Sequence, residues 1–170
     1  EGKTVSVSGS GDVAPYSVEK ALQLGAKVGT VSDSSGTIYD PEGFTAEKLA
    51  ILMDVKNHHY GRVNDYAKRT GVEFLPGKTP WHIPADVALP SATQNELDEQ
   101  DARTLIKNGV LCVAEGANMP STNEAAKVFE TAGVLYAPGK ASNAGGVATS
   151  GLEMSQNAQR LSWTRDEVDA

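Results

Sequence analysis

The sequence is poor in the residues on which several classes of protein depend. It contains one cysteine, Cys112, among 170 residues, which excludes an internal disulfide and a thiolate zinc site. Its three histidines lack the spacing of metal ligands, so we expect no metal site. Cys112 lies in an apolar run, and we expect it in the core of a protein kept in a reducing compartment.

Long apolar runs and clusters of basic residues are also missing. No apolar run, Val110–Ala114 included, exceeds five residues, which is far too short to span a bilayer. No charged segment followed by an apolar one opens the sequence, so we expect no targeting segment. The net charge is −7 and the isoelectric point is near 4.9, which argues against nucleic acid as a partner. We therefore expect a cytoplasmic protein with no membrane partner.

Apolar, β-branched runs alternate with helical patterns along the chain. We expect strands at 3–8, 27–32, 86–89, 110–114 and 134–136, a small excursion at 37–39, and helices at 11–24, 45–56, 63–70, 99–107, 123–132 and 145–161. This alternation predicts a Rossmann-like α/β fold, a doubly wound and mostly parallel sheet with helices on both faces. Ligands bind such sheets outside the carboxyl ends of the strands, so residues that directly follow a strand are functional candidates.

Both ends of the sequence have the pattern of interrupted elements. The first expected strand begins almost at once, and "TRDE" (164–167) is a capping box with only three residues after its Glu. We therefore expect residues 1–161 to form one dinucleotide-binding domain and residues 162–170 to be the truncated start of a following helix. On this interpretation the chain is a piece of a longer protein.

The segment "SGSGDVA" follows the first expected strand and fits the pattern G-x-G-x-x-A. Gly9 permits a tight turn, Gly11 lets the backbone approach a pyrophosphate, and Ala14 lets the helix pack closely on the sheet. The helix N-terminus adds free amide groups and a positive dipole end. An acid, Asp33, lies 22 residues after Gly11 at the end of the second strand. The pattern predicts a dinucleotide site; a glycine turn that serves packing alone is the alternative.

Four further stretches carry a resemblance to a known family. They are "LPSATQNEL" (89–97), "VAEGANMPSTNEA" (113–125), "APGKASNAGGVATSGLEMSQNA" (137–158) and "RLSWT" (160–164). Together with "SGSGDVA" they resemble, from end to end of the chain, the cofactor-binding domain of hexameric, bacterial-type glutamate dehydrogenase. The resemblance implies an enzyme that interconverts L-glutamate and 2-oxoglutarate plus ammonia by hydride transfer to or from a nicotinamide. It also implies a homohexameric parent whose N-terminal substrate and catalytic domain is absent from this chain.

The resemblance also implies roles for individual residues. It places on the coenzyme Gly9, Ser10, Gly11, Asp12 and Val13 (pyrophosphate), Ala92, Thr93 and Gln94 (ribose side), Gly116, Ala117 and Asn118 (nicotinamide ribose) and Asn143 (nicotinamide amide). Val147 and Ser150 match positions that face the substrate. The family's catalytic residues lie in the other domain, so we expect no catalytic residue here and coenzyme binding without turnover.

Simpler roles are open for several of these side chains. Gln94 and Asn95 could cap the helix that follows them, Asn143 could cap the last helix, and Ser150 could be a buried helix hydroxyl. Asp12 stands where the family has Asn, and like unit charges at about 4 Å repel by about 4 kcal/mol at an effective dielectric of about 20. We expect Asp12 to turn away from the pyrophosphate; protonation and weaker binding are the alternatives.

The end of the second strand, "VSDSSG", bears on the choice of coenzyme. An acid there accepts from the ribose 2′-hydroxyl and selects NAD, whereas a 2′-phosphate needs donors and cations. Asp33 is such an acid, but Ser34 is a donor, and "SDS" followed by Lys56 and Arg62 resembles the NADP-preferring members. We expect NADP(H), with Asp33 on the ribose 3′-hydroxyl. The alternatives are an NAD-dependent glutamate or other amino-acid dehydrogenase, and a stand-alone nucleotide-binding module.

Overall fold

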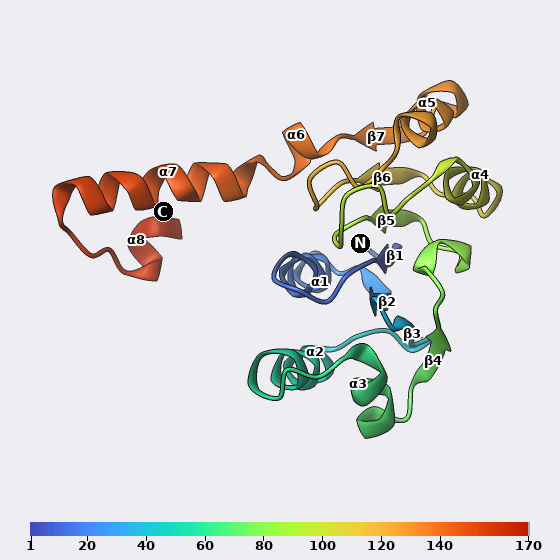
Figure 1. The fold of residues 1–170 in the computed structure, drawn as a ribbon, viewed down its shortest axis with the longest axis horizontal. Coiled ribbons are helices and arrows are strands. Elements are labelled where there is room, and N and C mark those ends of the chain that lie inside the picture. Colours follow the sequence, from blue (N-terminus) through green and yellow to red (C-terminus); the bar gives the residue numbers. More distant parts are fainter. Residues whose placement is uncertain (170) are drawn as a thin grey trace.

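The strands of the computed structural model, which describes residues 1–169, form one seven-stranded sheet. In chain order they are β1 (Thr4–Val7), β2 (Lys27–Asp33), β3 (Gly36–Tyr39), β4 (Glu73–Pro76), β5 (Val87–Leu89), β6 (Cys112–Ala114) and β7 (Leu135–Ala137). Their spatial order is β4-β3-β2-β1-β5-β6-β7 (Figure 1). Five neighbouring strands, β2, β1, β5, β6 and β7, are parallel to one another. At one edge β3 pairs antiparallel with β2, and β4 pairs antiparallel with β3. The predicted mostly parallel sheet is confirmed.

Helices cover both faces of this sheet (Figure 1). They are α1 (Val13–Gln23), α2 (Ala46–Met53), the π-helical turn η1 (Asp54–His58), α3 (Val63–Thr70), the 3-10 turn η2 (Pro80–His82), α4 (Glu99–Lys107), α5 (Asn123–Ala132), α6 (Gly139–Ser142), α7 (Ala144–Gln159) and α8 (Arg165–Asp169). One core, with Val18 and Tyr66, joins α1, α2 and α3 to β1–β3. A second, with Leu105 and Phe129, joins α4 and α5 to β5 and β6. The strand order reverses between β1 and β5, which makes that position the topological switch point.

Local signals begin these helices where the sequence predicts. The hydroxyls of Thr45 and Thr122 each accept a hydrogen bond from the backbone amide three residues on, at the starts of α2 and α5. Asp98 and Asp101 cap α4 reciprocally. The observed α1, α3, α4 and α5 therefore agree with the expected helices to within two residues.

Other elements differ from the expectations. The sequence did not predict β4, because "EFLP" is short and its partner β3 lies more than thirty residues earlier in the chain. The expected helix 45–56 ends as an α-helix at Met53 and continues as η1. Cys112 is only partly buried, not in the core, because it lies on the face of β6 opposite to the buried Val113.

The C-terminal helices leave the sheet. The helix α7 extends away from the sheet (Figure 1). It has no buried residue, and it exposes the apolar side chains of Val147 and Met154. The helix α8 begins at the expected capping box, where the Thr164 amide donates to Glu167 at 2.7 Å. Of the segment 162–170, residue 170 lies outside the described residues. No helix among residues 1–169 combines the length and the apolar character needed to cross a bilayer.

Candidate functional site

The loops after β1, β2, β5 and β6 meet at the carboxyl edge of the sheet and line two adjoining pockets of about 580 and 520 Å³. The larger pocket lies over β1 and β2, and the smaller lies over β5 and β6. Both are lined by Val13 and Ala92, so they are two halves of one groove that crosses the switch point. A dinucleotide binds doubly wound sheets at this place.

The loop after β1 has one conformation that glycine alone accepts without strain. Gly9 has a φ of +85°, and its amide donates to the Ser32 hydroxyl at 2.9 Å while its carbonyl accepts from the Ser32 amide at 3.1 Å. A Cβ at Gly9 would lie 2.6 Å from the carbonyl oxygen of Ser91. The loop is therefore clamped between β2 and the loop after β5.

The next residues of this loop fit the diphosphate of a dinucleotide. A Cβ at Gly11 would meet no atom within 4 Å, so its backbone faces open space. The Ser10 hydroxyl is buried and has no partner among the described residues, and the N-terminus of α1 follows at Val13. Open backbone, a free donor and a helix N-terminus together suit an anion. Asp12 is exposed, makes no capping hydrogen bond and helps to line the groove, so its turning away stays a prediction.

The four residues that the sequence analysis selected for the adenosine end lie together. The Arg62 guanidinium donates to the Ser34 hydroxyl, and Lys56 Nζ is 3.7 Å from Asp33 Oδ2. Lys56 comes from η1, and Arg62 directly precedes α3, so the fold brings both cations back to the end of β2. Ser34 and Lys56 line this end of the groove, and Arg62, which is not among the lining residues, adjoins it through its bond to Ser34.

The Asp33 carboxylate is held by hydrogen bonds from Ser35 and Val63. Its Oδ1 accepts from the Ser35 amide at 2.8 Å and from the Ser35 hydroxyl, and its Oδ2 accepts from the Val63 amide at 2.9 Å at the start of α3. Burial opposes the charged form, but the hydrogen bonds from Ser35 and Val63 and the charge of Lys56 outweigh it and lower the pKa of Asp33. Both carboxylate oxygens thus have partners, and the expected contact with a ribose 3′-hydroxyl stays a prediction.

Asp33 is expected to make the protein's stability depend on pH in acid. Because its folded pKa lies below the ordinary value of 3.8, its contribution is present above that value and is lost as the pH falls through the folded pKa. Asp33→Asn should flatten the fall in the free energy of unfolding between about pH 5 and pH 2, measured by urea denaturation. Asp12→Asn, at an exposed acid without a capping bond, is the control. A wild-type slope in Asp33→Asn would contradict this assignment.

The second half of the groove is organised around Asn143. Its Nδ2 donates to the carbonyls of Gly116 and Ala117, at 3.3 and 3.2 Å, and to Asn118 Oδ1 at 2.9 Å. The fold thus joins two segments that the sequence analysis assigned to the nicotinamide end. Although Asn143 precedes α7, its side chain makes no capping hydrogen bond, so the simpler capping role is wrong.

The remaining predicted site residues lie in different parts of the groove or outside it. Thr93 lines the first half of the groove, and Gln94 and Val147 line the second. The side chain that caps α4 is Asp98, so a capping role for Gln94 or Asn95 is wrong. Ser150 is exposed and lines neither half, so the alternative of a buried hydroxyl is wrong.

Two acids at this edge were not singled out from the sequence. Glu96 lines the first half and accepts from the Ser8 hydroxyl and the Ala92 amide, each at 2.9 Å; burial raises its pKa in spite of these bonds. Glu115 is 3% exposed at the end of β6. The rule that strand ends carry function points to Glu115, whereas no local pattern marks Glu96.

Comparison with known proteins gives the family of the chain. Residues 1–170 match the sequence model described as Glutamate/Leucine/Phenylalanine/Valine dehydrogenase. The chain belongs to this family.

Two relatives and one solved structure show how closely this member is matched. It is 65% identical to the NADP-specific glutamate dehydrogenase of Haemophilus influenzae and 63% identical to the NAD(P)-specific glutamate dehydrogenase of Xylanibacter ruminicola, with 99% of the chain covered in both. It superimposes on the crystal structure of Plasmodium falciparum glutamate dehydrogenase with a TM-score of 0.94 and 50% identity, covering 98% of this chain and 36% of that one. The chain spans 38% of the length of each of the two relatives.

Proposed function

We propose that this chain is the NADP-binding part of a glutamate dehydrogenase that interconverts L-glutamate and 2-oxoglutarate plus ammonia. The observation that carries the proposal is the cluster of Ser34, Lys56 and Arg62 at one end of a groove whose centre suits a diphosphate. The family and the printed names of its relatives support the reaction. A homohexameric assembly of the full-length protein belongs to the same proposal.

Each part of the groove has a role in this proposal. The diphosphate is held by the amides of residues 10–13 and by the Ser10 hydroxyl, and the 2′-phosphate by Ser34, Lys56 and Arg62. The riboses are held by residues 92–94 and 116–118, and the nicotinamide amide by Asn143. When bound, the coenzyme accepts or donates the hydride at its nicotinamide ring. The chain's own residues bind and orient it, and Val147 and Ser150 face the substrate from α7.

The hydrogen bonds at the end of β2 favour NADP over NAD. The Asp33 oxygens that would accept from a 2′-hydroxyl already have partners. Because the Ser34 hydroxyl accepts from Arg62, its own proton is directed elsewhere and is free to donate to a phosphate. Lys56 and Arg62 add the positive charge that a 2′-phosphate requires.

A full-length protein that carries this chain is expected to bind NADP⁺ more tightly than NAD⁺. Hydrogen bonds to a charged group contribute about 1.5–3 kcal/mol, which corresponds to roughly 10- to 100-fold in affinity. Isothermal titration with both coenzymes measures this ratio. Equal or tighter binding of NAD⁺ would overturn the choice of coenzyme but not the groove. The 170-residue chain alone should form no NADPH from glutamate, since the proposal assigns it no catalytic residue.

Use of both coenzymes is the second candidate function. It is favoured by one observation, the name of the 63% identical Xylanibacter ruminicola relative, which is NAD(P)-specific. In that case the two affinities in the same titration differ by less than about threefold, and both coenzymes support turnover of the full-length protein.

A further inference from the structure

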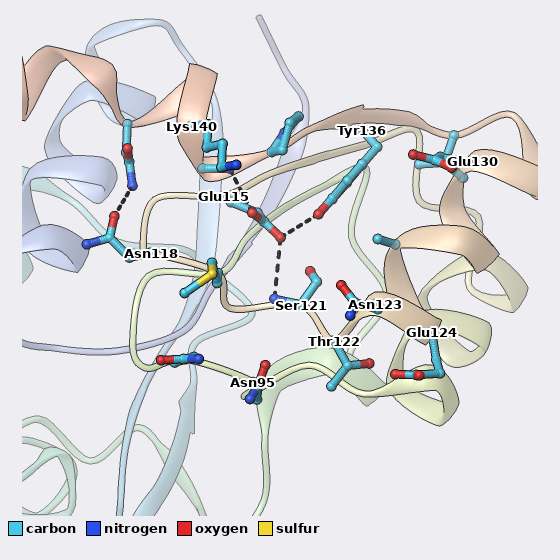
Figure 2. Close-up of a pocket in the computed structure, with 17 residues that line it drawn as sticks. Asn95, Glu115, Asn118, Ser121, Thr122, Asn123, Glu124, Glu130, Tyr136 and Lys140 are labelled. Carbon is cyan, nitrogen blue, oxygen red and sulfur yellow. Dashed lines mark hydrogen bonds between the residues drawn. The ribbon is translucent and has the colours of Figure 1, made fainter.

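Glu115 is a carboxylate buried at a place where three segments of the chain meet. It lies at the inner wall of a hollow of about 940 Å³ beside the groove, bounded by β7, α6 and the start of α5 (Figure 2). The side chain is 3% exposed, and its hydrogen-bond partners are all neutral groups. A buried carboxylate is tolerated only where hydrogen bonds replace its hydration. Its partners therefore show which segments depend on it.

The first partner is the short helix α6. Glu115 Oε2 accepts from the amide of Gly139, the first residue of α6, at 2.7 Å. The Glu115 carbonyl also accepts from the hydroxyl of Ser142, the last residue of α6. Glu115 thus holds both ends of the helix that directly precedes Asn143. A Cβ at Gly139 would lie 2.8 Å from the Ala117 carbonyl, so α6 has no room to shift toward this loop.

The second and third partners lie on β7 and on the loop after β6. Glu115 Oε1 accepts from the Tyr136 hydroxyl at 2.7 Å and from the Ser121 amide at 3.3 Å (Figure 2). Burial and the adjacent carboxylate both raise the pKa of Tyr136, so its hydroxyl stays a donor. The Ser121 bond closes the loop that carries residues 116–118. That loop also pairs with the loop after β5, where the Asn95 amide donates to the Met119 carbonyl at 3.0 Å.

We propose that Glu115 is a positioning residue for the nicotinamide half of the groove. It lines the neighbouring hollow and not the groove itself, so it acts through α6 and the loop after β6. By fixing both, it places Asn143 against the Gly116 and Ala117 carbonyls and Asn118. The inference rests on the proposed coenzyme site and adds to it a residue that sets the geometry of one half alone.

The test is Glu115→Gln in a full-length protein that carries this chain, titrated with two probes. On the proposed function, NADP⁺ fills both halves of the groove. Adenosine 2′,5′-bisphosphate lacks the nicotinamide end and would fill only the first half. Glutamine keeps the size of the side chain, but its amide group cannot accept hydrogen bonds at both former oxygen positions. We expect the dissociation constant for NADP⁺ to rise about tenfold, as for the loss of one or two hydrogen bonds, with that for the bisphosphate unchanged within about twofold.

The matched control is Glu130→Gln, which removes an exposed carboxylate from the same hollow (Figure 2). It should change neither dissociation constant. If Glu115→Gln does not fold, Tyr136→Phe is the deciding variant, because it removes one of the three hydrogen bonds that the Glu115 carboxylate accepts. It should raise the dissociation constant for NADP⁺ about threefold and leave that for the bisphosphate unchanged.

Three results would overturn the inference. The first is that Glu115→Gln raises the dissociation constants for NADP⁺ and for the bisphosphate equally. The second is that it changes neither constant, and the third is that Glu130→Gln raises the NADP⁺ constant as much as Glu115→Gln does. A wild-type protein that binds neither probe would instead overturn the proposed function, and this inference with it. The two failures are therefore read from different proteins, the variant in one case and the wild type in the other.

Discussion

Replacing Arg62 by alanine is expected to weaken NADP⁺ binding roughly 10- to 100-fold and to leave NAD⁺ binding within about twofold. The reason is the position of its guanidinium, which contacts the Ser34 hydroxyl at the end of β2. A guanidinium presents donors that match a phosphate, and its loss removes charge-assisted bonds that only the 2′-phosphate receives. Titration of both coenzymes into the full-length variant and wild type measures the effect.

The control for this prediction is Arg69→Ala. Arg69 lies near the end of α3 and pairs with Asp54 at 2.6 Å, whereas Arg62 precedes α3 and contacts Ser34, which lines the groove. Removal of the Arg69 charge changes the net charge of the protein by the same amount. If Arg69→Ala weakened NADP⁺ as much as Arg62→Ala, the effect would come from overall charge and not from a phosphate contact. Equal loss of NADP⁺ and NAD⁺ in Arg62→Ala would place the guanidinium elsewhere on the coenzyme.

Gly9→Ala is expected to lower the free energy of unfolding by about 2–4 kcal/mol, because it combines a strained backbone with a steric clash. The φ of Gly9 is +85°, and the added methyl group would lie 2.6 Å from the Ser91 carbonyl oxygen and 3.0 Å from its carbon. Both atoms belong to backbone, which cannot move aside as a flexible side chain can. Urea denaturation followed by circular dichroism measures the loss.

Gly11→Ala is the matched comparison within the same loop. A methyl group there meets nothing within 4 Å, so we expect stability within about 0.5 kcal/mol of the wild type. The same methyl group would stand where the backbone is proposed to approach the diphosphate, so NADP⁺ and NAD⁺ should both bind roughly tenfold more weakly. Equal stability of the two alanine variants would contradict the clash at Gly9, and unchanged binding in Gly11→Ala would contradict the diphosphate site.

Much of the fold could be predicted because its signals are local. Helices α3, α4 and α5 begin and end at the expected residues, since caps and terminal glycines act within a few residues of the chain. The alternation of strands and helices predicted the parallel sheet, and strand ends indicated where to look for the groove. The strand β4 was not predicted, because it forms by pairing with β3, a segment distant in the chain, and its own four residues carry no strand pattern.

The candidate site likewise has features that the sequence predicts and features that only the tertiary structure shows. The sequence alone determined the glycine loop, because that pattern depends on residue types at fixed spacing. Ser34, Lys56, Arg62 and Asn143 were chosen through the resemblance to glutamate dehydrogenases, and their contacts with a coenzyme stay predictions. Only the tertiary structure decided that both Asp33 oxygens are taken up by Ser35, Val63 and Lys56, and that Glu115 is buried between three segments. A carboxylate's burial and partners come from residues distant in the chain, so no local pattern can give them.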